Sequence, residues 1–272
     1  MSQVSQFLKD LAKHSDAVKK ATRPLRHLGV TCFYYLSVKN NGDHVLLTDC
    51  PEVDDYYYDE KLYVKDPYLR HPDNYQSGFL HFETDHKQEY DASLAYIIQK
   101  FKIAPLLGLC QKQQDSVDFF GFWGEADRAP YVVPSQYTHL LKAFAPHFKK
   151  ECKSLLQPDV GPFLSLRKLL GAEVFDNVAT QERKEEAKLF RQYLIEIGFK
   201  DKVVKADSLS QREKECLQLL LRGKAMKETA SILHLSPRTV EHYIDSARDK
   251  LGCRYKNELF ALAEEFVNLG LI

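Results

Sequence analysis

A stretch near the C-terminus, residues 236–251, places polar side chains on one side of an expected helix and apolar ones on the other. The apolar residues recur every three or four positions and form one stripe that must face a core: Val240, Ile244, Ala247 and Leu251. The residues left on the outer face are Arg238, Thr239, Glu241, His242, Asp245, Ser246 and Asp249. Guanidinium, hydroxyl, carboxylate and imidazole groups can hydrogen-bond to base edges and phosphates. The pattern therefore indicates recognition chemistry rather than catalysis.

Strong local signals mark the ends of this helix and of its neighbours. Ser236 suits an N-cap, Pro237 suits the first turn, and Gly252 suits the C-terminal end. Further upstream, Ser210 and Glu213 have the spacing of a capping box. The sequence predicts four short helices, at about residues 210–223, 226–234, 236–252 and 257–269.

The second and third of these helices are joined by a tight turn at Leu235, Ser236 and Pro237. Two short helices with such a turn, the later one capped and polar on one face, are typical of a helix-turn-helix. In that motif the exposed side of the later helix enters the major groove of DNA.

In its individual residues, this stretch resembles the LuxR/FixJ-type helix-turn-helix family of bacterial transcription regulators. The resemblance implies a third helix that reads bases, a second that braces it through backbone contacts, and a fourth that pairs in a homodimer. It rests on Leu209, Ser210, Arg212, Glu213, Glu215, Leu217, Gly223, Lys227, Glu228, Ala230, Leu233, Leu235, Ser236, Thr239, Val240, Ile244, Lys250, Leu251, Gly252 and Glu258.

Nine residues are the candidate DNA contacts: Lys224, Lys227, Arg238, Thr239, Glu241, His242, Tyr243, Ser246 and Lys250. Alternatives stay open for two of them. Tyr243 can pack against the second helix instead of touching DNA, and Glu241 can accept from a cytosine amino group or repel phosphate. Lys250 suits a phosphate contact better than base reading.

The charge of this region is balanced. Residues 206–272 hold ten Lys and Arg against ten Asp and Glu. Because phosphate neutralisation supplies most non-specific DNA affinity, we expect the isolated region to bind DNA weakly. Dimerisation or a partner such as RNA polymerase is then needed for tight binding.

Composition restricts the class of protein. The 272 residues are 44% hydrophobic and 28% charged with a formal net charge of zero, which is typical of a soluble globular chain. No run of about 18 apolar residues is present, and the polar N-terminus lacks a signal peptide's apolar centre, so the expected location is cytoplasmic and away from membranes. The six cysteines are widely spaced, which favours reduced thiols over disulfides or a metal site.

The N-terminal part alternates helical and strand patterns. Helices are expected at residues 4–22, 87–101 and 135–156, and hairpins at residues 29–48 and 106–123, the first with its turn at Asn41-Gly42. Residues 50–78 are expected to be irregular, followed by a short strand at 79–82. The predicted class is α+β, an α/β sandwich with an antiparallel sheet joined through a helical connector to the four-helix region. We divide the chain into 1–157, 158–205 and 206–272, with connector helices at 163–175 and 180–197.

A tyrosine-rich segment is the candidate ligand site of the N-terminal part. Tyr57, followed nine residues later by Asp66-Pro67, resembles the Tyr and Asp-Pro elements of autoinducer-binding (PAS/GAF-like) sensor domains. That resemblance implies that Asp66 accepts from a ligand amide and that Tyr57 and Tyr63 wall a pocket for a small amphiphile. A partly buried capping loop is the alternative. Val53 and His81–Phe82 stand near two tryptophan positions of those domains, so a lactone is not favoured, since two indole donors are missing.

Together these features predict a DNA-binding transcription regulator, dimeric and controlled by its N-terminal sensor. The hairpins argue against a phosphorylation receiver, which alternates strands and helices in parallel. No phosphate-cradling glycine loop, metal-spaced cluster or nucleophile motif indicates an enzyme or a cofactor. An adaptor that uses the helix-turn-helix to bind protein is the alternative function.

Overall fold

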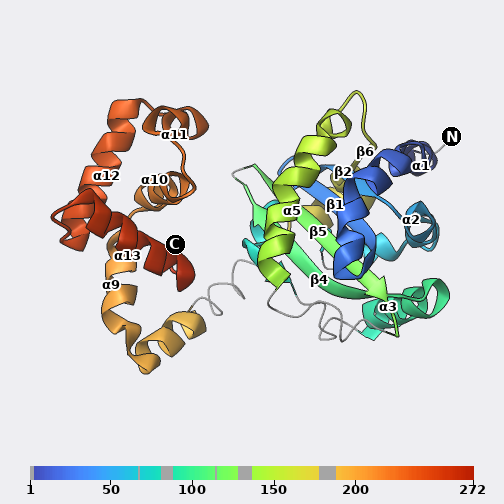
Figure 1. Cartoon of the computed structure of the whole chain (residues 1–272), viewed down its shortest axis with the longest axis horizontal. Coiled ribbons are helices and arrows are strands. Elements are labelled where there is room, and N and C mark those ends of the chain that lie inside the picture. Colours follow the sequence, from blue (N-terminus) through green and yellow to red (C-terminus); the bar gives the residue numbers. More distant parts are fainter. Residues whose placement is uncertain (1–2, 67, 81–87, 114, 128–136, 178–187) are drawn as a thin grey trace. The chain divides into compact units, whose positions relative to one another are not determined.

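The structure is a computed structural model that describes residues 3–66, 68–80, 88–113, 115–127, 137–177 and 188–272 (Figure 1). The chain forms two compact units, Met1–Ala179 and Thr180–Ile272. The first combines a sheet with helices and the second is helical, which confirms the predicted α+β class. Within the described residues, no helix is long and apolar enough to cross a membrane.

The first unit is built on a six-stranded sheet with the order β3-β4-β5-β1-β2-β6. Every pairing is antiparallel. Both predicted hairpins are confirmed, and they join in the middle of the sheet through β1 and β5. The strands are β1 (Val30–Lys39), β2 (Asp43–Thr48), β3 (Gly78–Leu80), β4 (Ile103–Lys112), β5 (Ser116–Glu125) and β6 (Phe163–Ser165).

Helices cover both faces of this sheet. On one face α5 (Thr138–Glu151) packs its Phe144 and Phe148 against Phe33 of β1, with ring centroids 5.4 Å and 4.9 Å apart. The other face carries α2 (Pro51–Asp59) and α3 (Gln88–Phe101), whose apolar residues cluster with Cys32 and Trp123 (Figure 1). The first helix, α1 (Gln3–Thr22), contributes side chains to both layers.

Some local predictions were wrong. Residues 51–59, expected to be irregular, form α2, in which Pro51 occupies the first turn. Residues 163–175, expected to be one helix, form β6 and then α6 (Leu166–Leu170) and α7 (Ala172–Phe175), which are separated by Gly171 at φ 88°. The helix that follows Pro134 continues through Pro146 and ends at Glu151, before a 3₁₀ turn. Predicted element ends at 81–82, 87, 135–136 and 180–187 lie outside the described residues.

The second unit contains the four predicted C-terminal helices. They are α10 (Gln211–Leu221), α11 (Met226–Ile232), α12 (Pro237–Leu251) and α13 (Lys256–Asn268). Residues 188–194 are also helical. Gly198, at φ 96°, interrupts the helical conformation before α9 (Lys200–Ser208) begins. The sequence did not predict α9, which buries Val203 and Ala206 in the same core as α10 to α13.

Gly121 of β5 allows a close approach of β1. It is paired with Tyr34, whose ring lies where a Cβ of residue 121 would be. We expect Gly121→Ala to displace this ring and to lower the unfolding free energy of the first unit by about 1–3 kcal/mol. Urea unfolding followed by Trp123, the only tryptophan, measures this loss. Gly78→Ala, where no atom lies within 4 Å of the new Cβ, is the control, and an equal loss in both variants would contradict the packing argument.

Candidate functional site

The capped helix α12 has the orientation expected from its sequence. The Ser236 hydroxyl accepts from the Thr239 backbone N–H at 3.0 Å, and Gly252 ends the helix at φ 71°. The apolar stripe is buried as predicted, with Val240, Ile244, Ala247 and Leu251 in the core. The opposite face of α12 lies outside this core, with Arg238, Glu241 and His242 exposed within the second unit.

A tight turn joins α11 to α12. His234 has a left-handed backbone at φ 54°, and the Leu235 N–H donates to the Ala230 carbonyl at 2.8 Å. Ala230 and Leu233 are buried beneath the turn. These contacts give the two helices the connection expected of a helix-turn-helix.

A buried carboxylate links α12 to α10. Glu213 is 2% exposed and accepts from the Ser210 N–H at 2.6 Å, the Ser246 hydroxyl at 2.6 Å and the Lys250 ammonium at 2.9 Å. Burial acts to raise the pKa of Glu213, but the hydrogen bonds from Ser246, Lys250 and Ser210 outweigh it and hold the pKa below its usual value. The predicted capping box is thus also a tertiary contact.

The structure separates the nine candidate DNA contacts into two groups. Lys224, Lys227, Arg238, Glu241 and His242 are exposed. The remaining four make contacts within the unit: Thr239 bonds Ser236, Tyr243 packs partly against the core, and Ser246 and Lys250 bond Glu213. For Ser246 this differs from the outward orientation expected, because Glu213 approaches from a helix distant in sequence.

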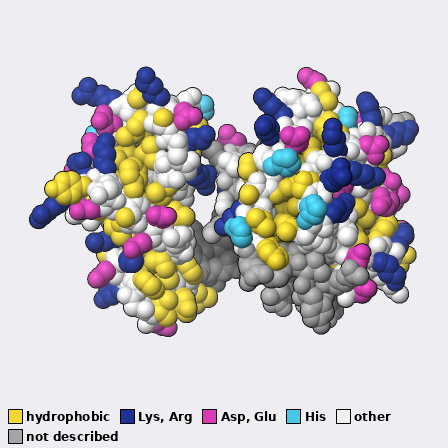
Figure 2. All heavy atoms as spheres, viewed as in Figure 1, with side chains coloured by type: hydrophobic (Ala, Val, Ile, Leu, Met, Phe, Trp, Pro, Cys, Tyr) yellow, Lys and Arg dark blue, Asp and Glu magenta, His cyan; other side chains and the backbone are white. Residues whose placement is uncertain are grey.

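Charge is interspersed over this unit. On the face seen in Figure 2, Lys and Arg side chains alternate with Asp and Glu across α9–α13. Arg248 pairs with Asp245 at 3.1 Å and lies 3.5 Å from Asp249. Among the described residues, the candidate contacts Arg238, Lys224 and Lys227 form no ion pair, so their charges can meet phosphate without breaking a salt bridge.

The first unit contains a cavity of about 110 Å³ between the sheet and α2 and α3. Its walls come from β1, β2 and β5, from α2 and α3, and from the segment after α2. The lining residues are Cys32, Tyr34, Leu36, Leu46, Thr48, Val53, Asp54, Tyr57, Tyr58, Leu62, Asp66, Tyr68, Leu69, Leu94, Ile97, Phe119 and Trp123.

Two of the three predicted ligand residues meet at this cavity. The Tyr57 hydroxyl donates to Asp66 Oδ2 at 2.6 Å, and the Tyr68 N–H donates to Asp66 Oδ1 at 2.7 Å. Tyr63 is buried behind them, its ring 5.6 Å from that of Tyr58, and does not line the cavity. Tyr57 and Asp66 are therefore hydrogen-bonded to each other at the cavity, whereas Tyr63 packs against Tyr58.

Sequence reasoning missed Asp54 as a cavity residue. It lies one helical turn before Tyr58 on α2, so this spacing places both on one face of the helix. This spacing could not be recognised from the sequence because residues 50–78 were expected to be irregular rather than helical.

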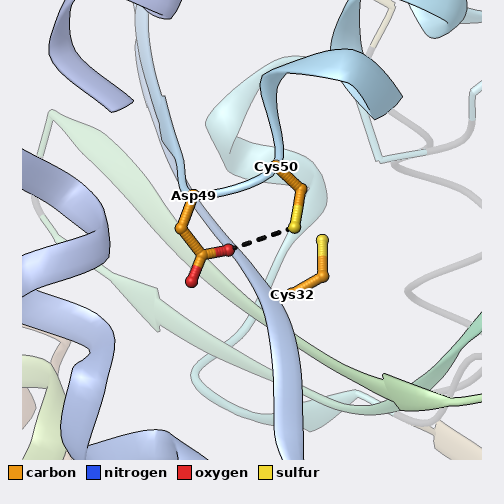
Figure 3. Close-up of side chains that lie close together, drawn as sticks. All are labelled: Cys32, Asp49 and Cys50. Atoms are coloured by element: carbon orange, nitrogen blue, oxygen red, sulfur yellow. Dashed lines mark hydrogen bonds between the residues drawn. The ribbon is translucent and has the colours of Figure 1, made fainter. Parts of the chain in front are cut away.

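Cys32, Asp49 and Cys50 lie close together beside the cavity, with their ligand atoms within 4.8 Å of one another (Figure 3). Asp49 accepts from the Phe33 N–H and the Thr22 hydroxyl, both at 2.7 Å, and from the Arg26 guanidinium at 2.9 Å. The Cys50 thiol lies 3.4 Å from Asp49 Oδ1. Because both carboxylate oxygens already accept from the protein, and Arg26 would repel a cation, the cluster fits a structural junction better than a metal site.

A family model matches part of the second unit. Residues 207–263 match the family described as bacterial regulatory proteins, luxR family. The spore germination protein GerE of Bacillus subtilis (strain 168) is 40% identical over 50 residues, which span 18% of this chain and 68% of GerE.

Two solved structures align over longer stretches at low identity. SdiA in complex with octanoyl-rac-glycerol is 15% identical with a TM-score of 0.42, covering 96% of this chain and 93% of that one. CepR2 of Burkholderia cenocepacia, an N-acylhomoserine lactone dependent LuxR family transcription factor, is 11% identical with a TM-score of 0.36, covering 55% and 94%.

The helix-turn-helix and its residues define a DNA-binding transcription regulator. The chain belongs to the luxR family of bacterial regulatory proteins.

The Glu213 network makes stability of the second unit depend on pH. Because the folded pKa of Glu213 is lowered, its contribution is present above the unfolded pKa and is lost as the pH falls through the folded one. We expect Glu213→Gln to lower the unfolding free energy by about 1.5–3 kcal/mol at pH 7 and to flatten this acid dependence. Hydrogen exchange of α10 and α12 peptides measures both. Glu241→Gln, on the exposed face, is the control, and the same effect there would rule out the network.

Proposed function

We propose that this chain is a sequence-specific transcription regulator that binds DNA as a homodimer under the control of a small ligand in its N-terminal cavity. The observation that supports DNA reading best is α12, whose caps and buried stripe leave Arg238, Glu241 and His242 exposed together near its N-terminal half. Residues at that end of a recognition helix contact base edges.

The proposed roles follow from position. Arg238, Thr239, Glu241 and His242 contact bases, while Lys224 and Lys227 contact phosphates from the α11 side. Tyr243, Ser246 and Lys250 hold the helix at its angle, and Lys250, whose side chain is 40% exposed, also approaches phosphate. In this proposal residues 1–157 sense, 158–205 connect and 206–272 read DNA.

The cavity supports ligand control. It is mostly apolar, and the Tyr57–Asp66 pair gives it a fixed acceptor, which is the usual composition of a small-molecule site. We infer that Tyr57 and Asp66 orient the polar end of an amphiphile and that Tyr63 supports them through Tyr58.

The DNA-reading proposal is tested with the full chain. A duplex is first selected from a randomised pool, and its affinity is measured by fluorescence anisotropy. We expect Arg238→Ala with His242→Ala to weaken binding by about 1–3 kcal/mol for each of the two base-reading side chains removed. Arg212→Ala, an exposed arginine of α10 that pairs with Glu215, should leave the affinity unchanged. Selection of no duplex, or binding that is insensitive to salt, would favour the protein-binding adaptor.

The balanced charge of residues 206–272 leads to a second prediction. We expect the fragment 180–272, which contains the complete helical core, to bind the selected duplex more weakly than the full chain, because one subunit offers few phosphate contacts. We also expect Lys227→Ala to reduce the slope of log affinity against log salt by about 0.9. Equal affinity of fragment and full chain would contradict the need for dimerisation through the rest of the chain.

A further inference from the structure

The cavity is acidic. Its lining, within the described residues, includes the carboxylates of Asp54 and Asp66 and contains no Lys, Arg or His. The remaining polar groups are tyrosine and threonine hydroxyls, a cysteine thiol and the tryptophan indole. A buried carboxylate is costly unless a cation or several donors compensate it, and the two carboxylates differ in this respect.

Asp66 is compensated by donors from the protein. It is 8% exposed and accepts on both oxygens, from the Tyr57 hydroxyl and the Tyr68 N–H. For Asp54, a hydrogen bond from Thr48 favours ionisation, but burial opposes it more strongly.

The titratable groups that influence Asp54, or that it influences, are acids on every side. Glu52 and Asp55 lie on its own helix and Asp49 lies at the end of β2. The charge of Asp54 helps to raise the pKa values of Tyr34 and Cys32 of β1 and of Tyr58, one turn further along α2. Among these neighbours, Asp49 is the one paired with a cation, Arg26, at 2.9 Å. Burial first, and then these acidic neighbours, raise the pKa of Asp54 to about 7.

We propose that the ligand of this cavity is an amphiphile with a protonated amine, whose ammonium group lies between Asp54 and Asp66. Its apolar chain follows the side chains of Leu36, Leu46, Leu94, Ile97 and Phe119. This proposal rests on the proposed control by a ligand and adds the chemical class of that ligand. Asp54 is the residue that selects the cation, because Asp66 alone, with its donors in place, can also accept from a neutral amide.

Two pH effects with opposite signs follow. Without ligand, the raised pKa means that the folded chain holds a proton on Asp54 that the unfolded chain has released, so stability falls as the pH rises from about 4 to about 7. An ammonium ion requires Asp54 in its ionised form, so its binding releases that proton. Amine affinity therefore increases as the pH rises through about 7 and then levels off, since a primary amine stays protonated to about pH 10.

The test compares octylamine, 1-octanol and octanoate, which share a chain and differ in head group. Binding to the full chain is measured by calorimetry and by the thermal transition of Trp123 fluorescence, at pH 6 and pH 8. We expect octylamine to bind most tightly, more so at pH 8, and Asp54→Asn to weaken it roughly tenfold or more. Asp59→Asn, exposed on the same helix and not among the groups that shift the pKa of Asp54, is the matched control and should bind as the wild type does.

The outcomes distinguish the ligand class from ligand control itself. Binding of octanol or octanoate as tight as that of octylamine, or unchanged affinity in Asp54→Asn, overturns the ammonium assignment and leaves a ligand site in place. Failure of all three to bind the wild type, with DNA binding intact, overturns ligand control as well. Asp54→Asn should be more stable than the wild type at pH 8, so a loss of amine binding cannot be ascribed to unfolding, and the pH dependence of the wild type tests the proposal without any variant.

Discussion

The arrangement of α10 and α12 in the second unit depends on one buried carboxylate. Glu213 closes the first turn of α10 and, through Ser246 and Lys250, holds the second half of α12. The apolar stripe of α12 determines which side faces the core, but a stripe of aliphatic side chains tolerates some rotation and sliding. Ser246 and Lys250, on two successive turns of α12, donate directional hydrogen bonds to this one carboxylate and remove that freedom. The exposed residues at the other end of α12 are therefore presented at a defined angle.

The first unit holds one carboxylate in a similar network of hydrogen bonds and has another that lacks one. Asp49 accepts from α1, from the 3₁₀ turn after it and from β1, and so fastens the start of β1 to the end of β2. Asp54, five residues later on α2, has a hydrogen bond from Thr48 among the described residues and lies beside other carboxylates. A carboxylate surrounded by protein donors is stabilised in its ionised form, whereas one that faces a cavity among other acids has a raised pKa and stays protonated over a wider pH range.

Features that depend on local spacing were predicted from the sequence, and features that depend on distant contacts were not. The caps at Ser210, Ser236 and Gly252 and both hairpins follow from neighbouring residues, and the structure reproduces them. The α2 helix was missed because its tyrosines and carboxylates are poor helix indicators, and it is stabilised by packing against the sheet. The inward turn of Ser246 and the enclosure of Asp54 depend on partners that are far away in the sequence. Tyr57 and Asp66 were found because their spacing is itself a local pattern.

The pairing of β1 with β5 has a consequence for how the chain folds. These strands lie at the centre of the sheet, yet β1 ends at Lys39 and β5 begins only at Ser116. The two hairpins can each form from local contacts, but joining them requires closure of the long loop that carries α2 and α3, and such closure slows folding. During synthesis the helices that wall the cavity therefore emerge before the sheet that completes it. The second unit also joins distant residues, since Ser246 and Lys250 of α12 reach Glu213 of α10, but the loops that these contacts close are shorter than the one between β1 and β5.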